Sequence, residues 1–354
     1  MPSKLYPLVA FLVAAIVVLW TTPVVKSVGL RNGKTDKPGD RKIHTTPMVR
    51  LGGVSIFTGT MIGLLIVWWL GGFGWLPSQE EWQIWGVAIG GVAFFLIGLA
   101  DDLLNLPASL RLVLQAIVAS AVWWVGVRID FLSIPGSSLT HLGWLSLPIT
   151  VIWFVGMANA INWIDGVDGL AAGVSAIAAV VMLIVSLFMD QSGAALIAAA
   201  MAGAALGFLR YNFNPAQIFM GDGGAYFMGF TLAGVGVIGL VKSTAVTAVL
   251  LPYLILAVPI IDMSAVIFLR LSNGKSPFKA DKRHLHHRLL EAGLSQRLTV
   301  LFIYSLTLWA GSLALAFSGI PSGGAYALGA TFLLGYTSWQ VWRKAKRKEK
   351  ENCD

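Results

Sequence analysis

Apolar stretches of about twenty residues recur along the whole chain, and they limit its fold more than any other feature. A helix of that length crosses a hydrocarbon core of about 30 Å, where every backbone N–H and C=O group must be bonded within the protein. Only 12% of the residues are charged, whereas a soluble domain carries about a quarter. These observations exclude an ordinary soluble enzyme and predict an all-α, polytopic membrane helical bundle.

About eleven transmembrane helices are predicted, joined by mostly short connections. The predicted spans are residues 6–28, 51–72, 82–100, 110–127, 145–164, 169–189, 194–209, 225–241, 244–271, 299–317 and 325–341. The longest outer connection, 128–144, has a sequence typical of a small hairpin. The first span lacks a convincing cleavage site, so we expect it to stay in the membrane rather than to be removed as a signal peptide.

The distribution of positive charge predicts how these spans are oriented. The chain holds 25 Lys and Arg against 17 Asp and Glu, and with the N-terminus outside only Lys4, Arg128 and Lys242 fall on the outer side. The positive-inside rule therefore places the N-terminus outside and the C-terminus in the cytoplasm. We expect one transmembrane catalytic domain, 1–342, with cytoplasmic loops 29–50, 101–109, 210–224 and 272–298, and a basic cytoplasmic tail, 343–354.

Two adjacent aspartates, Asp101 and Asp102, lie where the third span reaches the cytoplasm. Carboxylates at a helix C-terminus oppose the macrodipole, and neighbours repel each other, so we expect a cationic partner. One interpretation is that Asp102 caps a following short helix while Asp101 is solvated. The other makes the pair a magnesium or proton-handling site, because hard cations and phosphate chemistry both use oxygen ligands.

A second polar cluster ends the fifth span. Asn159 and Asn162 share one helical face, and two Asp-Gly steps, at Asp165 and Asp168, then break the helix. Asp168 fits a cap for the next span, but a cap explains neither the asparagines nor Asp165. Asparagine amides offer donors and acceptors that suit a sugar, a phosphate or a base edge.

The eighth span begins among glycines, with Asp222 between Gly221 and Gly223. Bare backbone lets a ligand approach closely, and a helix N-terminus attracts anions. A metal on Asp222 and a diphosphate beside this helix end are consistent with each other. Phe219 offers a ring face to a base, although an isolated aromatic residue in such a place is more often a membrane-interface anchor.

The inner loop 272–298 holds three of the five histidines of the chain. If the segment is helical, His284, His287 and Arg288 share one face and leucines line another. A zinc site and attraction to acidic lipids are alternatives, but the first lacks further ligands and the second does not explain the histidines. We favour phosphate recognition. The basic loop around Lys42 suits the same role, although positive-inside orientation alone supplies such charges.

Taken in chain order, these motifs resemble those of the polyprenyl-phosphate N-acetylhexosamine-1-phosphate transferases over almost the whole chain. The motifs are Asp101-Asp102-Leu-Leu-Asn105, Asn159 and Asn162 with Asp165-Gly-Val-Asp168-Gly, Phe219-Met-Gly-Asp222, and His284-Leu-His286-His287-Arg288. Asn105 follows the N-acetylglucosamine-type pattern. The resemblance implies transfer of N-acetylglucosamine 1-phosphate from UDP-N-acetylglucosamine to undecaprenyl phosphate, with release of UMP, in the bacterial cytoplasmic membrane. Such a reaction is the first lipid-linked step of cell-envelope polysaccharide synthesis.

The same resemblance implies roles for individual residues. Asp222 is then the principal ligand of Mg²⁺, with Mn²⁺ as an alternative cation, and the catalytic residues are Asp101, Asp102 and His287. The residues implied to bind substrate are Lys42, Asn162, Asp165, Asp168, Phe219, His284, His286 and Arg288. The implied partners are UDP-N-acetylglucosamine, undecaprenyl phosphate and the lipid bilayer, without nucleic acid. The separate roles of the two adjacent aspartates, the choice of hexosamine, the prenyl length, the downstream polymer and a homodimer stay open.

An ion- or proton-coupled membrane transporter is the main alternative function, because carboxylates within spans also mark ion pathways. Asp262, predicted inside the ninth span near Pro259, is the residue that this alternative explains best. A carrier places its polar residues near the bilayer midplane, however, whereas the clusters above lie at inner helix ends. A scaffold without catalysis would leave the paired aspartates and clustered histidines unexplained.

Overall fold

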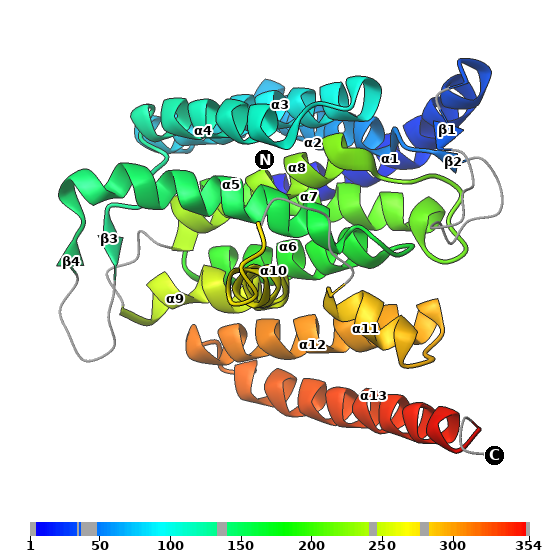
Figure 1. Cartoon of the computed structure of the whole chain (residues 1–354). Coiled ribbons are helices and arrows are strands. Elements are labelled where there is room, and N and C mark those ends of the chain that lie inside the picture. The colour runs from blue at the N-terminus through cyan, green and yellow to red at the C-terminus, as the bar shows by residue number, and fades with distance from the viewer. Residues whose placement is uncertain are drawn as a thin grey trace.

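The computed structural model describes residues 5–33, 35–36, 48–132, 140–240, 246–276 and 283–351, and these are mostly helical (Figure 1). The helices are α1 (Tyr6–Arg31), α2 (Gly52–Trp69), α3 (Ser78–Leu104), α4 (Ala108–Trp124), α5 (Ser146–Ile164), α6 (Leu170–Phe188), α7 (Ser192–Asn212), α8 (Gly221–Val235), α9 (Val246–Ile255), α10 (Ala257–Leu271), α11 (Leu285–Glu291), α12 (Gln296–Phe317) and α13 (Gly323–Glu351). Strand β1 (Thr35–Asp36) pairs antiparallel with β2 (Met48–Val49), and β3 (Phe131–Leu132) with β4 (Thr140–His141). The second pair confirms the hairpin predicted within 128–144.

Seven helical segments in the described part of the chain are long and apolar enough to cross a membrane. They are α1, α2, α3, α5 with the turn before it, α6, α7 and α12. The other predicted spans coincide with helices that are shorter or carry more charge, namely α4, α8, α9 with α10, and α13. Helices of this kind satisfy their own backbone, so the chain is an all-α integral membrane protein.

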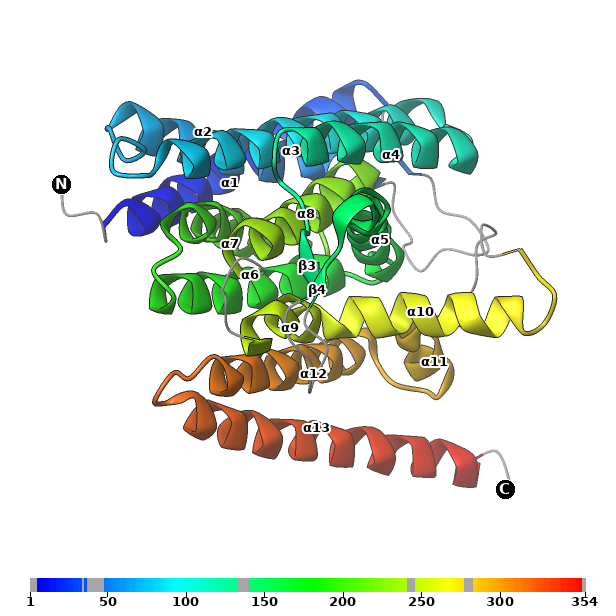
Figure 2. The same ribbon diagram turned by 90° about the vertical axis from the view of Figure 1, so that its left-hand side faces the viewer.

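Residues 244–271, predicted as one span, contain two helices in the structure. α9 ends at Ile255 and α10 begins at Ala257, so the helix is interrupted at Leu256. Pro259 lies in the first turn of α10, where it has no N–H group and its ring excludes a normal helical bond to the carbonyl of Ile255. The interruption is therefore a local effect of proline, and it gives α10 a direction of its own (Figure 2).

The central helix of the bundle is α8, which packs against α2, α3, α5 and α7. Every residue of α8 is buried except Asp222. Small residues allow this dense packing, since a methyl group on Gly53 of α2 would overlap the backbone of Gly224 in α8. Asp222 therefore belongs to the most enclosed helix and is the one residue of that helix with an accessible side chain.

The start of α1 and the end of α13 lie at opposite ends of the bundle, and α12 and α13 lie side by side along one edge (Figure 2). α13 continues without a break past residue 342, so the basic segment expected as a tail begins as part of this helix. The cytoplasmic ends inferred from the sequence thus include the end of α3, the start of α8 and the end of α13.

Candidate active site

Three carboxylates meet where the last turn of α3 packs on the first turn of α8. Asp101 and Asp102 come from α3, and Asp222 comes from α8. The two helices approach closely because a methyl group on Gly98 would overlap the backbone of Asp222, so only a residue without a side chain fits there. The structure thus brings the adjacent Asp101 and Asp102 together with Asp222, which lies more than a hundred residues later in the sequence. We call Asp101, Asp102 and Asp222 the carboxylate cluster.

Asp102 is bound to the N-terminus of α8. Its Oδ1 accepts the backbone N–H of Asp222 and its Oδ2 accepts that of Gly223, each over 3.0 Å. Gly221 makes this turn with a φ of +76°, and a Cβ there would lie 2.6 Å from Asp102 Oδ2. A carboxylate at this position satisfies two otherwise unpaired N–H groups and complements the helix dipole.

This contact contradicts one interpretation of the sequence and restricts another. Asp102 does not cap the helix that follows it, because α4 begins after Pro107 without a side-chain cap. The diphosphate expected beside the N-terminus of α8 cannot use the N–H groups of Asp222 and Gly223 while Asp102 holds both of them. A protein carboxylate takes the place of the anion that this helix end attracts.

Arg111 is the cationic partner predicted for the paired aspartates. Its Nη1 contacts Asp101 Oδ2, lies 3.2 Å from the hydroxyl of Tyr226 and is 3.5 Å from Asp222 Oδ2. The other oxygen of Asp101 accepts the backbone N–H of Leu106 over 2.8 Å. Sequence reasoning did not identify Arg111, although an arginine inside the predicted span 110–127 was a signal, since charges within a span are rarely without a function.

Asp222 is held from two further directions. Asn162 Nδ2 donates to Asp222 Oδ1 over 2.8 Å, and Arg50 Nη2 lies 3.5 Å from the same oxygen. The Asp222 side chain is 19% exposed, compared with 7% for Asp101. The structure thus places Asn162, a predicted substrate-binding residue, in direct contact with the predicted metal ligand. Asn159, on the same face of α5, bonds instead to Gln115 of α4.

The turn between α5 and α6 carries the next two predicted residues. Asp165 is partly buried, and this desolvation raises the pKa of its carboxyl to about 7. Asp168 Oδ2 accepts the side-chain amide of Asn214 over 3.1 Å and the backbone N–H of Ala216 over 2.9 Å. The capping role considered for Asp168 is wrong, since α6 starts after Gly169 without a side-chain cap. Asp168 fastens the loop between α7 and α8 instead.

The histidine segment, residues 283–291, contains α11 and packs on the same turn. His286 is 2% exposed, and burial lowers the pKa of its ring to about 3, so it is neutral at physiological pH. A Cβ on Gly166 would lie 2.5 Å from His286 Nε2. His287 is partly buried with its ring centroid 4.2 Å from that of His286, and Arg288 is exposed.

His284, His286 and Arg288 therefore do not form one solvent-facing cationic surface. His284 is buried beside Asp262, and His286 is buried under Gly166, whereas Arg288 is exposed. The helix α11 begins after His284, so His284 precedes the helix and does not share a helical face with His287 and Arg288. The phosphate-binding role of the segment stays a prediction, with the exposed and partly buried residues as its candidates.

The remaining predicted residues lie before α2 and before α8. The backbone of Phe219 joins both segments, since its N–H donates to Val49 and its carbonyl accepts from Gly52, each over 2.9 Å. This pairing also carries Arg50 to the carboxylate cluster. Lys42 lies outside the described residues. The roles of Phe219 and Lys42 in binding a nucleotide stay predictions.

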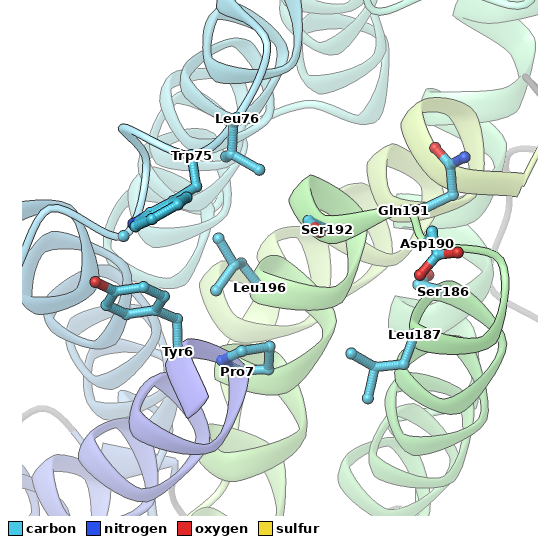
Figure 3. Close-up of a pocket in the computed structure, with 11 residues that line it drawn as sticks. Tyr6, Pro7, Trp75, Leu76, Ser186, Leu187, Asp190, Gln191, Ser192 and Leu196 are labelled. Atoms are coloured by element: carbon cyan, nitrogen blue, oxygen red, sulfur yellow. The ribbon is translucent and has the colours of Figure 1, made fainter. Parts of the chain in front are cut away.

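A cavity of about 410 Å³ lies at the other end of the bundle and contains none of these residues (Figure 3). Leu76, which lines it, precedes α3, whereas Asp101 stands near the end of that helix of 27 residues, roughly 40 Å away along its axis. Tyr6 and Asp190 line the same cavity. The candidate active site is therefore the polar inner surface around Asp222 and not this cavity.

Comparison with known proteins identifies a family and several relatives of the chain. The sequence profile of glycosyl transferase family 4 matches residues 84–240, a range that includes the whole carboxylate cluster and Asn162. A probable undecaprenyl-phosphate N-acetylglucosaminyl 1-phosphate transferase of Bacillus subtilis is 38% identical over 298 residues, which cover 84% of this chain and 80% of that relative.

Two further relatives extend the likeness to other bacteria. A decaprenyl-phosphate N-acetylglucosaminephosphotransferase of Mycobacterium tuberculosis is 34% identical over 330 residues, covering 86% of this chain and 80% of the relative. An undecaprenyl-phosphate alpha-N-acetylglucosaminyl 1-phosphate transferase of Escherichia coli is 29% identical over 347 residues, covering 95% and 91%.

Proposed function

The chain belongs to glycosyl transferase family 4, together with the polyprenyl-phosphate N-acetylglucosaminyl 1-phosphate transferases, and on that premise we propose its reaction. It transfers N-acetylglucosamine 1-phosphate from UDP-N-acetylglucosamine to undecaprenyl phosphate, giving UMP and undecaprenyl-diphospho-N-acetylglucosamine. The observation that carries this proposal is the meeting of the carboxylate cluster with two guanidinium groups, those of Arg50 and Arg111, at one end of the bundle.

In this reaction an oxygen of the lipid phosphate attacks the sugar-bearing phosphorus of the diphosphate, and the bond to UMP breaks. Arg50 and Arg111 suit the transferred group, since a guanidinium binds phosphate oxygens through paired N–H donors. A lipid phosphate is ionised at neutral pH and is already a nucleophile. The residues of the chain therefore act by orienting two anions in line and by reducing the repulsion between them.

We propose Mg²⁺ as the cofactor, with Asp222 as its principal ligand. The donor set fits this ion, because Mg²⁺ is usually held by one or two carboxylates together with water and substrate phosphates. Asp222 is partly exposed, and its guanidinium contacts at 3.5 Å are long for close ion pairs. The described residues contain no group of three or more His, Cys, Asp or Glu side chains that could enclose a metal alone. When bound, Mg²⁺ would neutralise the charge of the diphosphate.

The nucleotide sugar is proposed to bind between the carboxylate cluster and the turn of Asp165 and Asp168. Asn162 connects these two parts, since it precedes the turn and donates to Asp222. Asp168 contributes by fixing the loop that leads into α8, so its effect on binding is indirect. A neutral His286 offers hydrogen bonds rather than charge, which leaves His287 and Arg288 as the phosphate contacts of the histidine segment.

We also propose the finer topology, with eleven spans in the bacterial cytoplasmic membrane, the N-terminus outside and the active site facing the cytoplasm. The asymmetry of Lys and Arg supports it. An odd number of crossings agrees with the start of α1 and the end of α13 lying at opposite ends of the bundle (Figure 2). One chain supplies the whole carboxylate cluster.

The direct test is UMP release by the purified protein. The assay contains UDP-N-acetylglucosamine, undecaprenyl phosphate and magnesium in a neutral detergent, with omission of each component as a control. We expect UMP to form only in the complete mixture and the lipid product to carry the sugar label. Addition of UDP-N-acetylgalactosamine as a competitor shows which of the two hexosamines the protein transfers. Absence of both products from a folded preparation would refute the proposed reaction.

The transporter alternative gains nothing from the structure. Asp262, the residue that it explained best, is bound to His284 and to the backbone N–H of Leu285. The carboxylates of Asp101, Asp102 and Asp222 lie at helix ends rather than at mid-helix. Their position is that of a site at a membrane surface.

A further inference from the structure

Asp262 is a buried carboxylate with no part in the reaction proposed above. It lies in the second turn of α10 and is 9% exposed, among mostly apolar residues. An ionised carboxylate in such surroundings is costly unless it is hydrogen-bonded or paired. Its partners therefore indicate what it does.

Both oxygens of Asp262 bind the histidine segment. Oδ2 lies 2.8 Å from His284 Nδ1, and Oδ1 accepts the backbone N–H of Leu285 over 2.7 Å. Since an ionised carboxylate can only accept, Nδ1 of His284 carries the proton in this contact. The bonds join α10 to a segment more than twenty residues further along the chain, and charge-assisted bonds of this length are the strong ones.

The contact continues from His284 to the turn between α5 and α6. The ring of His284 lies edge-on to Trp163 of α5, with 5.5 Å between the centroids. It is also nearly parallel to the ring of His286, at 5.8 Å and an angle of 8°. His286 in turn lies against Gly166, where the approach leaves no room for a Cβ. A buried series of rings thus connects Asp262 with the backbone beside Asp165.

We infer that Asp262 is a positioning residue, which fixes the histidine segment on α10 and sets its rings against the turn at Gly166. Its carboxylate selects the Nδ1-protonated form of His284 and anchors the first N–H group of α11. It touches no substrate, and it acts through the placement of His286 and His287. The effect on turnover rests on the proposed function, whereas the anchoring does not.

The anchoring is tested by hydrogen exchange of the full-length protein in detergent. Asp262→Asn replaces one acceptor by a donor, so we expect the amides of residues 285–291 to exchange about ten-fold faster than in the wild type. Ser264→Ala is the matched control, because Ser264 is an exposed polar residue on the same helix. Equal exchange in Asp262→Asn and the wild type would overturn the inference. If Asp262→Asn does not fold, the same comparison is made with His284→Gln, which removes one of the two contacts.

Turnover tests the role of this anchor in the reaction. We expect kcat/KM for UDP-N-acetylglucosamine to fall at least about ten-fold in Asp262→Asn and in His284→Gln, and to recover partly in Asp262→Glu. The double variant should be no less active than Asp262→Asn alone, because the contact that His284→Gln removes is one of the two that Asp262 makes. Losses that multiply, or no recovery with glutamate in a folded protein, would contradict a positioning role. If the wild type itself releases no UMP, the proposed function fails while hydrogen exchange still decides the anchoring.

Discussion

Replacement of Asp102 by asparagine separates a structural carboxylate from a reacting one. In the structure both oxygens of Asp102 accept backbone N–H groups, those of Asp222 and Gly223, at 3.0 Å. Asparagine has nearly the same shape but only one acceptor oxygen. Its NH2 group would therefore face one of the two N–H groups, donor against donor, at the first turn of α8.

The size of the effect follows from this geometry. An N–H group left without an acceptor in a buried place costs about 1–3 kcal/mol. Loss of the negative charge at the N-terminus of α8 costs about 0.3–1 kcal/mol more. Relief of the repulsion between Asp102 and the other two carboxylates offsets part of the sum. We expect a net loss of about 2 kcal/mol, roughly a thirty-fold change in the folding equilibrium.

The measurement is thermal unfolding of the purified protein in detergent at one fixed heating rate, followed by tryptophan fluorescence. Asp102→Asn should unfold at a lower temperature than the wild type. The control is Asp190→Asn, an identical chemical change at an exposed residue whose positive φ of 54° asparagine tolerates. UMP release by Asp102→Asn should fall as well, because the displaced turn carries Asp222.

One result would refute the reasoning. Suppose that Asp102→Asn unfolds at the same temperature as the wild type and the Asp190→Asn control but releases almost no UMP. The carboxylate of Asp102 is then not needed to hold α8. Asp102 would then act on the substrate directly, as a base or as an electrostatic element. A shifted pH dependence of the residual turnover would identify the first of these roles.

Asp222→Asn should abolish magnesium-dependent UMP release and still unfold at the wild-type temperature, because Asp222 is the accessible residue of α8; unchanged magnesium dependence would remove it from the site. Burial raises the pKa of Asp165 to about 7 and lowers that of His286 to about 3. Ionisation of Asp165 is therefore easier in the unfolded chain, so this carboxyl destabilises the fold as the pH rises from about 4 to 7. Protonation of His286 is also easier in the unfolded chain, so this imidazole stabilises the fold as the pH rises from about 3 to 6.5. When the unfolding temperature is plotted against pH, Asp165→Asn should lack the fall between about pH 4 and 7, and His286→Gln should lack the rise between about pH 3 and 6.5. Plots that run parallel to that of the wild type would contradict the pKa values. In a cysteine-free background, a cysteine at Gln79 should react with a membrane-impermeant reagent in intact cells and one at Asn273 only after permeabilisation; the reverse pattern would invert the topology.

The helices were predictable because each follows from a local property of the sequence. An apolar run of about twenty residues forms a helix in a membrane whatever its neighbours are. The break at Leu256 was also encoded locally, in Pro259, but a hydropathy average over 244–271 conceals it. The turn after α5 was predicted from its Asp-Gly steps, which are also a local property of the sequence.

The cationic partner of the paired aspartates illustrates the limit of such reasoning. Repulsion and the helix dipole require a positive charge near Asp101, and this requirement is visible in the sequence. Repulsion and the helix dipole do not show which residue supplies this positive charge. The structure identifies Arg111, ten residues further on in the next helix, because the short connection turns α4 back beside the end of α3.

The contacts of Asp262 and Asp168 were not predictable at all from local pattern. Asp262 binds His284, and Asp168 binds Asn214, so each partner lies on a different element. Such pairings depend on how the helices pack, which hydropathy and turn signals leave undetermined. Interpreted alone, Asp262 suggested an ion pathway and Asp168 a helix cap.

The adjacency of Asp101 and Asp102 itself limits what the pair can do. Consecutive residues of an α-helix point about 100° apart, so both carboxylates cannot face one small ligand in the same way. Asp102 is accordingly directed to the backbone of α8, whereas Asp101 shares Arg111 with Asp222. A phosphate that draws Arg111 away would free oxygens of Asp101 and Asp222 together and leave Asp102 bound to α8. Of the two adjacent aspartates, Asp101 is therefore the one whose charge can respond to the substrate.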